Sequence, residues 1–486
     1  MDFRRVMRNS GYLLGFRLLS RFLSFLFLLF ATHRLKPGAF GTLSFTLVTL
    51  ELIITLGDFG VTRYGARELV RFWHERVGLS GKILAVQVIT SAGMALVGLL
   101  VVLAISPPAL KLEMLLLALA SFFFYSLINT TESVFIARQK FFFSALFSFT
   151  GRLTYTTLGL IALASTGSII LVMWAFLAAV ILETTIRLAV VRLRFTGFSF
   201  DFSTRDLWRM LRLSFPFAIA GVASMITFRG NMFVLDAFKG DVDVGIFNVA
   251  TTLFSPFIWI GIIFSSTVFP GLTSEYARDP ASARASSWQW YRLVALATIP
   301  LAVAVSLLSG PLTGLFPKDY AAAQPILIIM MWTVPPTLMT DVDLNILQVI
   351  NKESAAAKSV VIGAVLSPAV SIMLVPWLGG DGAAAAMLVA MIARELYCRI
   401  VIRKSFLDRG VTTLFVRPLI AGAVMAAAGI ALLRVSAWLA AAVSLAVFAV
   451  LVLAMKAVQV GEIKSILFRP AAADVNGSGN KYRKAP

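Results

Sequence analysis

The chain has 486 residues, of which 59% are hydrophobic and only 14% are charged, with 43 Lys and Arg against 24 Asp and Glu. Its mean hydropathy is +0.88. So much apolar surface cannot be buried in a soluble domain, which excludes a soluble fold. Because the chain has one cysteine, Cys398, and two histidines, the sequence excludes an internal disulfide and predicts neither a metal site nor a cofactor.

Apolar windows of about 20 residues, the length that crosses a hydrocarbon core, recur along the whole chain. In chain order they cover residues 11–32, 38–59, 81–105, 112–130, 142–165, 169–191, 214–238, 245–269, 290–308, 321–346, 357–377, 382–402, 414–433 and 437–458. The sequence therefore predicts an all-α integral membrane protein with about fourteen transmembrane helices. The polar residues at the C-terminus are expected to form a disordered cytoplasmic tail.

Lys and Arg are distributed unequally between the two sides of these predicted spans. With the N-terminus in the cytoplasm, the outer loops hold about six of the 43 basic residues and the inner side roughly thirty-two. The positive-inside rule thus favours a multi-pass protein of the inner membrane with both termini in the cytoplasm. Since topology accounts for the basic charge, the sequence does not indicate nucleic-acid binding.

The two halves of the chain resemble each other weakly. ETTIR (183–187) ends the sixth span and ELYCR (395–399) ends the twelfth, and Gly151 and Gly363 are separated by the same interval. Six helices per repeat is an even number, so both repeats run in the same direction through the membrane. We therefore expect an N-lobe in residues 1–206, a C-lobe in 207–404, two further helices in 405–458 and a tail in 459–486.

Five arginines lie deep within the predicted spans: Arg17, Arg21, Arg152, Arg229 and Arg394. Arg17 and Arg21 share one helix face, and Arg21 lies about 15 Å into its span. Each such charge costs roughly 2.5–3.5 kcal/mol at the centre of a membrane helix. We therefore expect these guanidinium groups to line an aqueous cavity shared by both lobes. A guanidinium fork suits phosphate, so the cavity predicts an anionic substrate.

Three carboxylates are candidate charge partners of arginines in the spans. Glu51 in the second span lies at nearly the depth of the first span's arginines and can neutralise one of them but not both. Glu183 and Glu395 stand four residues before Arg187 and Arg399, a spacing that predicts an ion pair on one helix face. A structural ion pair is therefore the alternative to a substrate-binding role.

Two D-x-D motifs raise the alternative of catalysis. Asp341 and Asp343 lie near the end of the tenth span, and Asp241 and Asp243 lie in an outer loop. Such pairs bind metal in glycosyltransferases, so a membrane glycosyltransferase or polymerase is a second class of function. These enzymes usually carry a large outer loop, which the predicted spans leave no room for. We therefore expect a protein that is not an enzyme.

Three stretches resemble one known family: RLKPGAFGTLSFTLVTLELIITLGDFGVTRYGARELVR, VGIFNVATTLFSPFIWIGIIFSSTVFPGLTSEYARD and LFPKDYAAAQPILIIMMWTVPPTLMTDVDLNILQVINKESAAA. They resemble the oligosaccharide–lipid flippases (the Wzx type) of the multidrug/oligosaccharidyl-lipid/polysaccharide exporter superfamily. In that family a G-x-[FY]-G turn lies at the start of the second helix, and a D-x-G with a downstream Arg-Glu lies at its end. The matching residues here are Gly38, Phe40, Gly41, Asp58, Gly60, Arg67 and Glu68.

The resemblance implies two six-helix lobes around a central cationic cavity. It also implies alternating-access transport of a polyprenyl-pyrophosphate-linked oligosaccharide, such as an O-antigen or other surface-polysaccharide repeat unit, from the inner to the outer leaflet. By position, Arg17, Arg21 and Arg229 correspond to the family's cavity residues, whereas Arg152 and Arg394 match no family motif. The expected partners are the lipid-linked oligosaccharide, membrane lipids, a polysaccharide polymerase and glycosyltransferases, with the transporter itself a monomer.

Two alternatives remain within the same superfamily. One is a flippase for the peptidoglycan lipid precursor, whose head group is also a pyrophosphate. The other is a cation-coupled exporter, which would require acidic residues in the first span, and residues 11–32 contain none.

Overall fold

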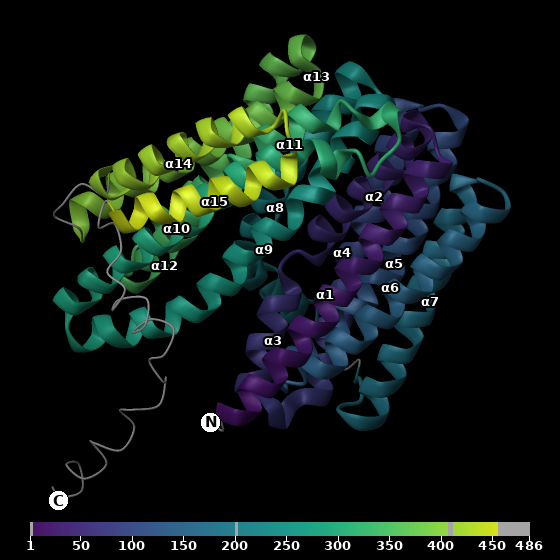
Figure 1. The fold of residues 1–486 in the computed structure, drawn as a ribbon. Coiled ribbons are helices and arrows are strands. Elements are labelled where there is room, and N and C mark those ends of the chain that lie inside the picture. The colour runs from purple at the N-terminus through teal and green to yellow at the C-terminus, as the bar shows by residue number, and fades with distance from the viewer. Residues whose placement is uncertain (1–2, 200–202, 407–411, 455–486) are drawn as a thin grey trace, which may run out of the picture. The chain divides into compact units, whose positions relative to one another are not determined.

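The computed structural model describes residues 3–199, 203–406 and 412–454, and every element in this part of the chain is helical (Figure 1). The elements are α1 (Phe3–Arg34), α2 (Pro37–Asp58), α3 (Val61–Arg71), η1 (Trp73–Glu75), α4 (Arg76–Ile105), α5 (Ala109–Ala137), α6 (Phe141–Ser165), α7 (Ile169–Arg194), α8 (Thr204–Lys239), α9 (Asp241–Arg278), α10 (Pro280–Thr313), η2 (Lys318–Tyr320), α11 (Ala323–Met331), α12 (Val334–Val349), α13 (Glu353–Ser405), α14 (Thr412–Leu432) and α15 (Ala437–Ala454). Within the described residues, nine helical segments are long and apolar enough to cross a membrane. The prediction of an all-α, multi-pass membrane protein is confirmed.

Two helices differ from the predicted spans. The window at 321–346 is divided into α11 and α12, because Pro335 and Pro336 lack the N–H groups that would continue one helix into the other. The windows at 357–377 and 382–402 are the two halves of α13, which is interrupted at Gly379 (φ 54°, ψ −129°). The chain reverses there so tightly that a Cβ atom on Gly382 would lie 2.7 Å from the Leu374 carbonyl oxygen.

The short helix α3 was not among the predicted spans, because its 11 residues contain no long apolar window. Its buried residues, among them Val61, Tyr64 and Leu69, pack into a cluster with Phe135 of α5 and Met210 of α8. Its three arginines are exposed, so α3 is an amphipathic helix between two spans.

The described residues divide into two compact units. The smaller unit combines residues 288–308 of α10 with α14 and α15, which lie side by side in Figure 1. Glycines allow this close packing: a Cβ atom on Gly422 would lie 2.5 Å from Ile299, and one on Gly429 would lie 2.3 Å from Leu307. The larger unit holds residues 1–287 and 309–408 and contains all of the deep arginines. The lobe boundaries at residues 206 and 404 stay predictions.

Within the larger unit, corresponding helices of the two halves pack in the same way. In the N-lobe α1 packs along α6, and α6 along α7 (Figure 1). In the C-lobe α8 packs along α13, with hydrogen bonds to Ser367 in its first half and to Ala383 in its second half. Gly151 of α6 lies against Glu183 of α7, as Gly363 in the first half of α13 lies against Arg394 in the second half. The repeat predicted from the sequence therefore corresponds to two pseudo-symmetric lobes.

The lobes meet where α2 crosses α9, near the turn between α1 and α2. We call this end of the molecule the Leu35 end, and the opposite end, where α2 turns into α3, the Gly60 end. A Cβ atom on Gly41 would lie 1.6 Å from the Asp241 carbonyl oxygen, and one on Gly245 would lie 2.3 Å from the Pro37 carbonyl oxygen. Only glycine at both positions lets the backbones approach this closely.

Candidate functional site

One ion pair joins the two lobes at mid-helix depth. Arg229 of α8 places its Nε atom 3.4 Å from the Oε2 atom of Glu51 in α2, and the two side chains are 26% and 52% exposed. At 1.5 Å per residue, Arg229 lies about 15 Å and Glu51 about 21 Å from the Leu35 ends of their helices. The sequence had paired Glu51 with an arginine of the first span, whereas the structure pairs it with an arginine of the other lobe.

Arg21 and Arg152 lie at one level on neighbouring parallel helices. Ring contacts fix the register of α1 on α6: Phe16 is 5.5 Å from Phe149, and Phe27 is 5.0 Å from Tyr155, between ring centroids. Both arginines are exposed, and each lies about 20 Å from the Leu35 end of its helix. The side chain of Arg17, one turn before Arg21 in α1, lies outside the described residues.

Arg152 and the Glu51–Arg229 pair have a common neighbour in Tyr125 of α5. The charges of Arg152 and Glu51 both act on the Tyr125 hydroxyl. Arg152 also places its guanidinium carbon 5.9 Å from the ring centroid of Tyr155. We call Glu51, Tyr125, Arg152 and Arg229 the mid-helix cluster. Its charged members are two guanidinium groups and one carboxylate, and a second carboxylate, Glu183 of α7, acts on Tyr125 and interacts electrostatically with Arg152.

Arg394, the fifth deep arginine, is enclosed within the C-lobe. Its side chain is 6% exposed, its Nη1 atom lies 3.7 Å from the sulfur of Met391, and its Cδ atom fills the space left by Gly363. The charged group that acts most strongly on it is Asp341 of α12. Arg394 therefore does not present its charge to a solvent-accessible surface in this structure, and its predicted role in substrate binding stays a prediction.

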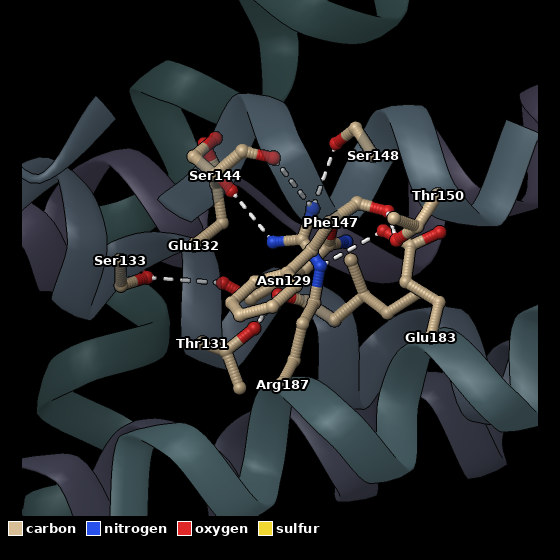
Figure 2. Close-up of polar contacts among 11 residues, drawn as sticks. Asn129, Thr131, Glu132, Ser133, Ser144, Phe147, Ser148, Thr150, Glu183 and Arg187 are labelled. Atoms are coloured by element: carbon tan, nitrogen blue, oxygen red, sulfur yellow. Dashed lines mark hydrogen bonds and ion pairs between the residues drawn. The ribbon is translucent and has the colours of Figure 1, made fainter. Parts of the chain in front are cut away.

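The N-lobe contains a buried polar network around Arg187 of α7 (Figure 2). Arg187 is the most deeply buried charged residue of this network. Its Nε atom donates to Glu183 at 2.8 Å, and its Nη1 atom donates to Glu132 of α5 at 2.9 Å. Its Nη2 atom donates to the Ser144 carbonyl oxygen at 3.2 Å and to the Ser148 hydroxyl at 2.7 Å. This network ties α5, α6 and α7 together, and the predicted Glu183–Arg187 pair is confirmed.

The C-lobe contains a matching network. Arg399 in the second half of α13 lies 2.5 Å from Glu395 and 3.8 Å from Asp343 of α12, which is fully buried. Thr340 of α12 donates a hydrogen bond to Glu395 at 3.2 Å. Each lobe thus encloses one guanidinium group between two carboxylates. The predicted Glu395–Arg399 pair is confirmed, and Asp343 of the D-x-D motif is part of this network.

The two family-motif segments shape the ends of α2. Gly38 and Gly41 lie at the crossing with α9, described above. At the other end, the Asp58 carboxylate accepts hydrogen bonds from the Thr62 backbone N–H at 3.3 Å, from the Thr62 hydroxyl and from Gln87 at 2.7 Å. Gly60 has a φ of 73°, and a Cβ atom there would lie 2.6 Å from the Ser214 carbonyl oxygen of α8. The Asp-x-Gly motif therefore turns the chain into α3.

The Arg-Glu pair of the same motif lies on α3. Arg67 contacts Glu68 at 3.6 Å and places its guanidinium group over the rings of Tyr64 (5.1 Å) and Phe217 (5.9 Å). Since Phe217 belongs to α8, Arg67 is a contact between the lobes at the Gly60 end.

The sequence did not single out a charged contact between the lobes at the Leu35 end. The ammonium group of Lys111 in α5 lies 2.7 and 2.9 Å from the two carboxylate oxygens of Asp236 in α8, and 3.1 Å from Asp241 in α9. It also lies 4.1 Å from the Phe45 ring centroid. Lys111 lies between the predicted spans at 81–105 and 112–130, and nothing in the sequence indicated its partners.

Two neutral contacts reinforce the same end. Asn248 of α9 donates to the Ser44 hydroxyl of α2 at 2.8 Å, and the buried Tyr320 hydroxyl donates to the Leu35 carbonyl oxygen at 3.0 Å. Burial raises the pKa of Tyr320 above its ordinary value, so the hydroxyl keeps the proton that this bond requires. In the described part of the chain, no group of three or more His, Cys, Asp or Glu side chains is placed to hold a metal ion.

A family model described as "Polysaccharide biosynthesis protein" matches residues 6–276, more than half of the chain. The chain belongs to this polysaccharide biosynthesis protein family. Comparison with curated protein sequences finds no significant match.

Solved structures share the fold of this family member at low sequence identity. A structure described as the lipid II flippase MurJ in an inward closed conformation matches with a TM-score of 0.71 and 18% identity, over 95% of this chain and 99% of that chain. A multidrug-resistance transporter of the MATE family in an inward-facing conformation matches with a TM-score of 0.62 and 14% identity, over 79% and 95%. A superfamily transporter from Pyrococcus furiosus, described as having a binding pocket of reversed polarity, matches with a TM-score of 0.59 and 14% identity, over 82% and 95%.

Proposed function

We propose that the protein is a flippase that carries a polyprenyl-pyrophosphate-linked oligosaccharide across the inner membrane, and that it performs no covalent chemistry. The contact between Arg229 and Glu51 carries this proposal. It places a guanidinium group at mid-helix depth, between the lobes, partly exposed and held by one long ion pair to a half-exposed carboxylate. Such a contact is exchangeable, because a phosphate offers the guanidinium fork a better partner than a single carboxylate oxygen at 3.4 Å.

The neighbouring charges favour the same class of substrate. Arg152 lies in the mid-helix cluster, and Arg21 lies at its level on α1, so two further guanidinium groups lie at about the depth of the Arg229–Glu51 pair. A pyrophosphate that displaces Glu51 from Arg229 supplies the missing negative charge. The polyprenyl tail stays in the lipid while the head group occupies this position. Arg17, on the same face of α1, is proposed as a further contact.

The transport step follows from how the lobes are joined. We propose that the Leu35 end faces outward, with both termini in the cytoplasm, as the distribution of Lys and Arg favours. Contacts between α2 and α9 then close the outer end, and they must open to release the head group to the outer leaflet. An interior-negative potential favours this direction by about 2.3 kcal/mol per charge for each 100 mV crossed.

Catalysis by the D-x-D motifs is not supported by their surroundings. Asp343 is fully buried beside Arg399, the charge of Arg394 acts on Asp341, and Asp241 is bound to Lys111. Carboxylates that are engaged by cations are poor ligands for a catalytic metal.

The proposal is tested by surface-polysaccharide export in cells that carry Arg229→Ala, Arg21→Ala or the control Arg192→Ala. Arg192 is an exposed arginine at the Gly60 end of α7, away from the mid-helix cluster. We expect export to fall at least tenfold for Arg229→Ala and Arg21→Ala, which corresponds to about 1.4 kcal/mol, and to be unchanged in the control. Export at the wild-type level by both variants, with normal amounts of protein in the membrane, would overturn the proposal.

A second candidate function is transport of the peptidoglycan lipid precursor. It is favoured by the fold shared with the lipid II flippase over nearly the whole of both chains. Both substrates present a pyrophosphate to the same arginines, so the residues do not discriminate between them. Growth of a strain depleted of its own peptidoglycan-precursor flippase, rescued by this protein, would favour the second function.

A further inference from the structure

Helix α3 carries a row of arginines on its exposed face. Arg63, Arg67 and Arg71 are spaced four residues apart, which places them one above another along the helix, and all three are exposed. The opposite face is buried in the cluster of Val61 and Tyr64. At 1.5 Å per residue, the 11 residues span only about 16 Å, so α3 lies between two membrane spans without crossing the bilayer.

The first turns of α8 carry a second row. Arg205, Arg209 and Arg212 are exposed and spaced along one side of the helix. The acidic residue of this segment, Asp206, caps the helix through Ser203 and lies 3.1 Å from Lys82 of α4. Because Asp206 is engaged by Lys82, it does not neutralise the neighbouring arginines.

The two rows belong to neighbouring helices of different lobes. Arg67 stacks on Phe217 of α8, Gly60 lies against the Ser214 carbonyl oxygen, and the charge of Arg209 acts on the Tyr64 hydroxyl. We call the six arginines of the two rows the arginine surface: Arg63, Arg67, Arg71, Arg205, Arg209 and Arg212. Glu68, the acid of α3, lies 3.6 Å from Arg67 and offsets one of the six charges.

Large apolar side chains are exposed among these arginines. Trp208 is 70% exposed, Val70 is 62% exposed and Phe215 is 50% exposed. Arginines beside exposed tryptophan and aliphatic groups, on a short amphipathic helix that joins two spans, are typical of a segment at the boundary between lipid head groups and acyl chains. A soluble acidic partner would leave these apolar groups in water.

We propose that the arginine surface binds the head groups of anionic phospholipids, with Trp208, Val70 and Phe215 in contact with their acyl chains. This site is separate from the mid-helix cluster and does not depend on the transported substrate. Because α3 belongs to the N-lobe, and Arg209 and Arg212 of α8 belong to the C-lobe, lipids bound across both rows hold the lobes together at the Gly60 end. The membrane's content of anionic lipid would then influence how readily this end opens.

The test uses the full-length protein purified in detergent, titrated with phosphatidylglycerol or phosphatidylcholine, with bound lipids counted by native mass spectrometry. The variant R63Q/R71Q/R209Q removes two charges from the row on α3 and one from the row on α8. It keeps the contact of Arg67 with the Phe217 ring. The matched control R192Q/R194Q/R403Q removes three exposed arginines from the Gly60 ends of α7 and α13. The variant R63K/R71K/R209K keeps the charge, and size-exclusion profiles and melting temperatures show that each variant is folded.

We expect the wild type to prefer phosphatidylglycerol, and the Gln variant to bind it about tenfold or more weakly, since each basic residue near the surface adds to the attraction of anionic lipid. The Lys variant and the control should bind within about twofold of the wild type. Equal loss in the control, or equal binding of both lipids by the wild type, would overturn the proposal. Displacement of phosphatidylglycerol by millimolar inorganic pyrophosphate would also overturn it, because the surface would then be a site for free phosphate groups.

Discussion

Replacement of Arg187 by methionine is predicted to destabilise the N-lobe strongly. The side chain is 1% exposed and makes four hydrogen bonds, two to carboxylates and two to Ser144 and Ser148. Methionine fills a similar volume but leaves Glu183, itself about 10% exposed, without its ion-pair partner. Removing one partner of a buried ion pair costs about 3–5 kcal/mol, because the remaining charge stays out of water. The cost here should lie in that range rather than near the 0–1 kcal/mol of a surface pair.

The assay is the melting temperature of the purified protein in detergent, compared across Arg187→Met, Arg187→Met with Glu183→Gln, and the exposed control Arg192→Met. We expect a large decrease for the single variant, a partial recovery for the double variant and no change for the control. The recovery is the decisive measurement, since it separates an uncompensated charge from lost packing. A double variant that melts no higher than Arg187→Met would refute the electrostatic reasoning.

Three further predictions concern the contacts between the lobes. Lys111→Met should slow disulfide formation between cysteines placed at Ser44 and Asn248 in a Cys398→Ala background, because Lys111 joins α5 of one lobe to Asp236 and Asp241 of the other. The control is Lys318→Met, since Lys318 is exposed at the same end, and a rate of disulfide formation that Lys111→Met leaves unchanged would contradict the prediction. Gly41→Ala should lower both the rate of this cross-linking and polysaccharide export, because the Cβ atom of the alanine would lie 1.6 Å from the Asp241 carbonyl oxygen. Gly93→Ala is the control and should match the wild type, since a Cβ atom at Gly93 has open space around it. Glu51→Gln should strengthen binding of undecaprenyl pyrophosphate to the detergent-purified protein several-fold, on the order of 1 kcal/mol, because Arg229 loses the carboxylate that competes with the pyrophosphate. Unchanged or weaker binding would argue against displacement of Glu51 from Arg229 by the substrate.

The positions of the membrane helices and their local ion pairs were predictable from the sequence. Hydropathy depends on about 20 consecutive residues, and the pairs Glu183–Arg187 and Glu395–Arg399 depend on one helical turn, so neither requires knowledge of how helices pack. The depth of Arg21, Arg152 and Arg229 follows from the same counting along the chain.

What was not predictable is the direction in which each side chain faces around its helix. Glu51 lies at the depth expected for a partner of the first span, yet the rotation of α2 turns it toward Arg229 of the other lobe. Arg394 lies within the twelfth predicted span but is enclosed beside Gly363. Lys111 finds two aspartates that are more than a hundred residues away in the chain. These partners are set by packing between helices, which a single sequence does not encode locally.

The placement of charges divides the arginines of the membrane helices by mechanical role. Arg187 and Arg399 each have two carboxylates of their own lobe around them, and such enclosed pairs resist separation because each charge would be left unpaired in a medium of low polarity. Arg229 has one carboxylate, from the other lobe, and that pair is partly exposed. A carrier that alternates its access needs both kinds of contact: lobes that move as rigid bodies, and an interface whose contacts can be exchanged for those of a substrate. Variants of Arg187 should therefore fail in stability before they fail in transport, and variants of Arg229 should fail in transport while remaining folded.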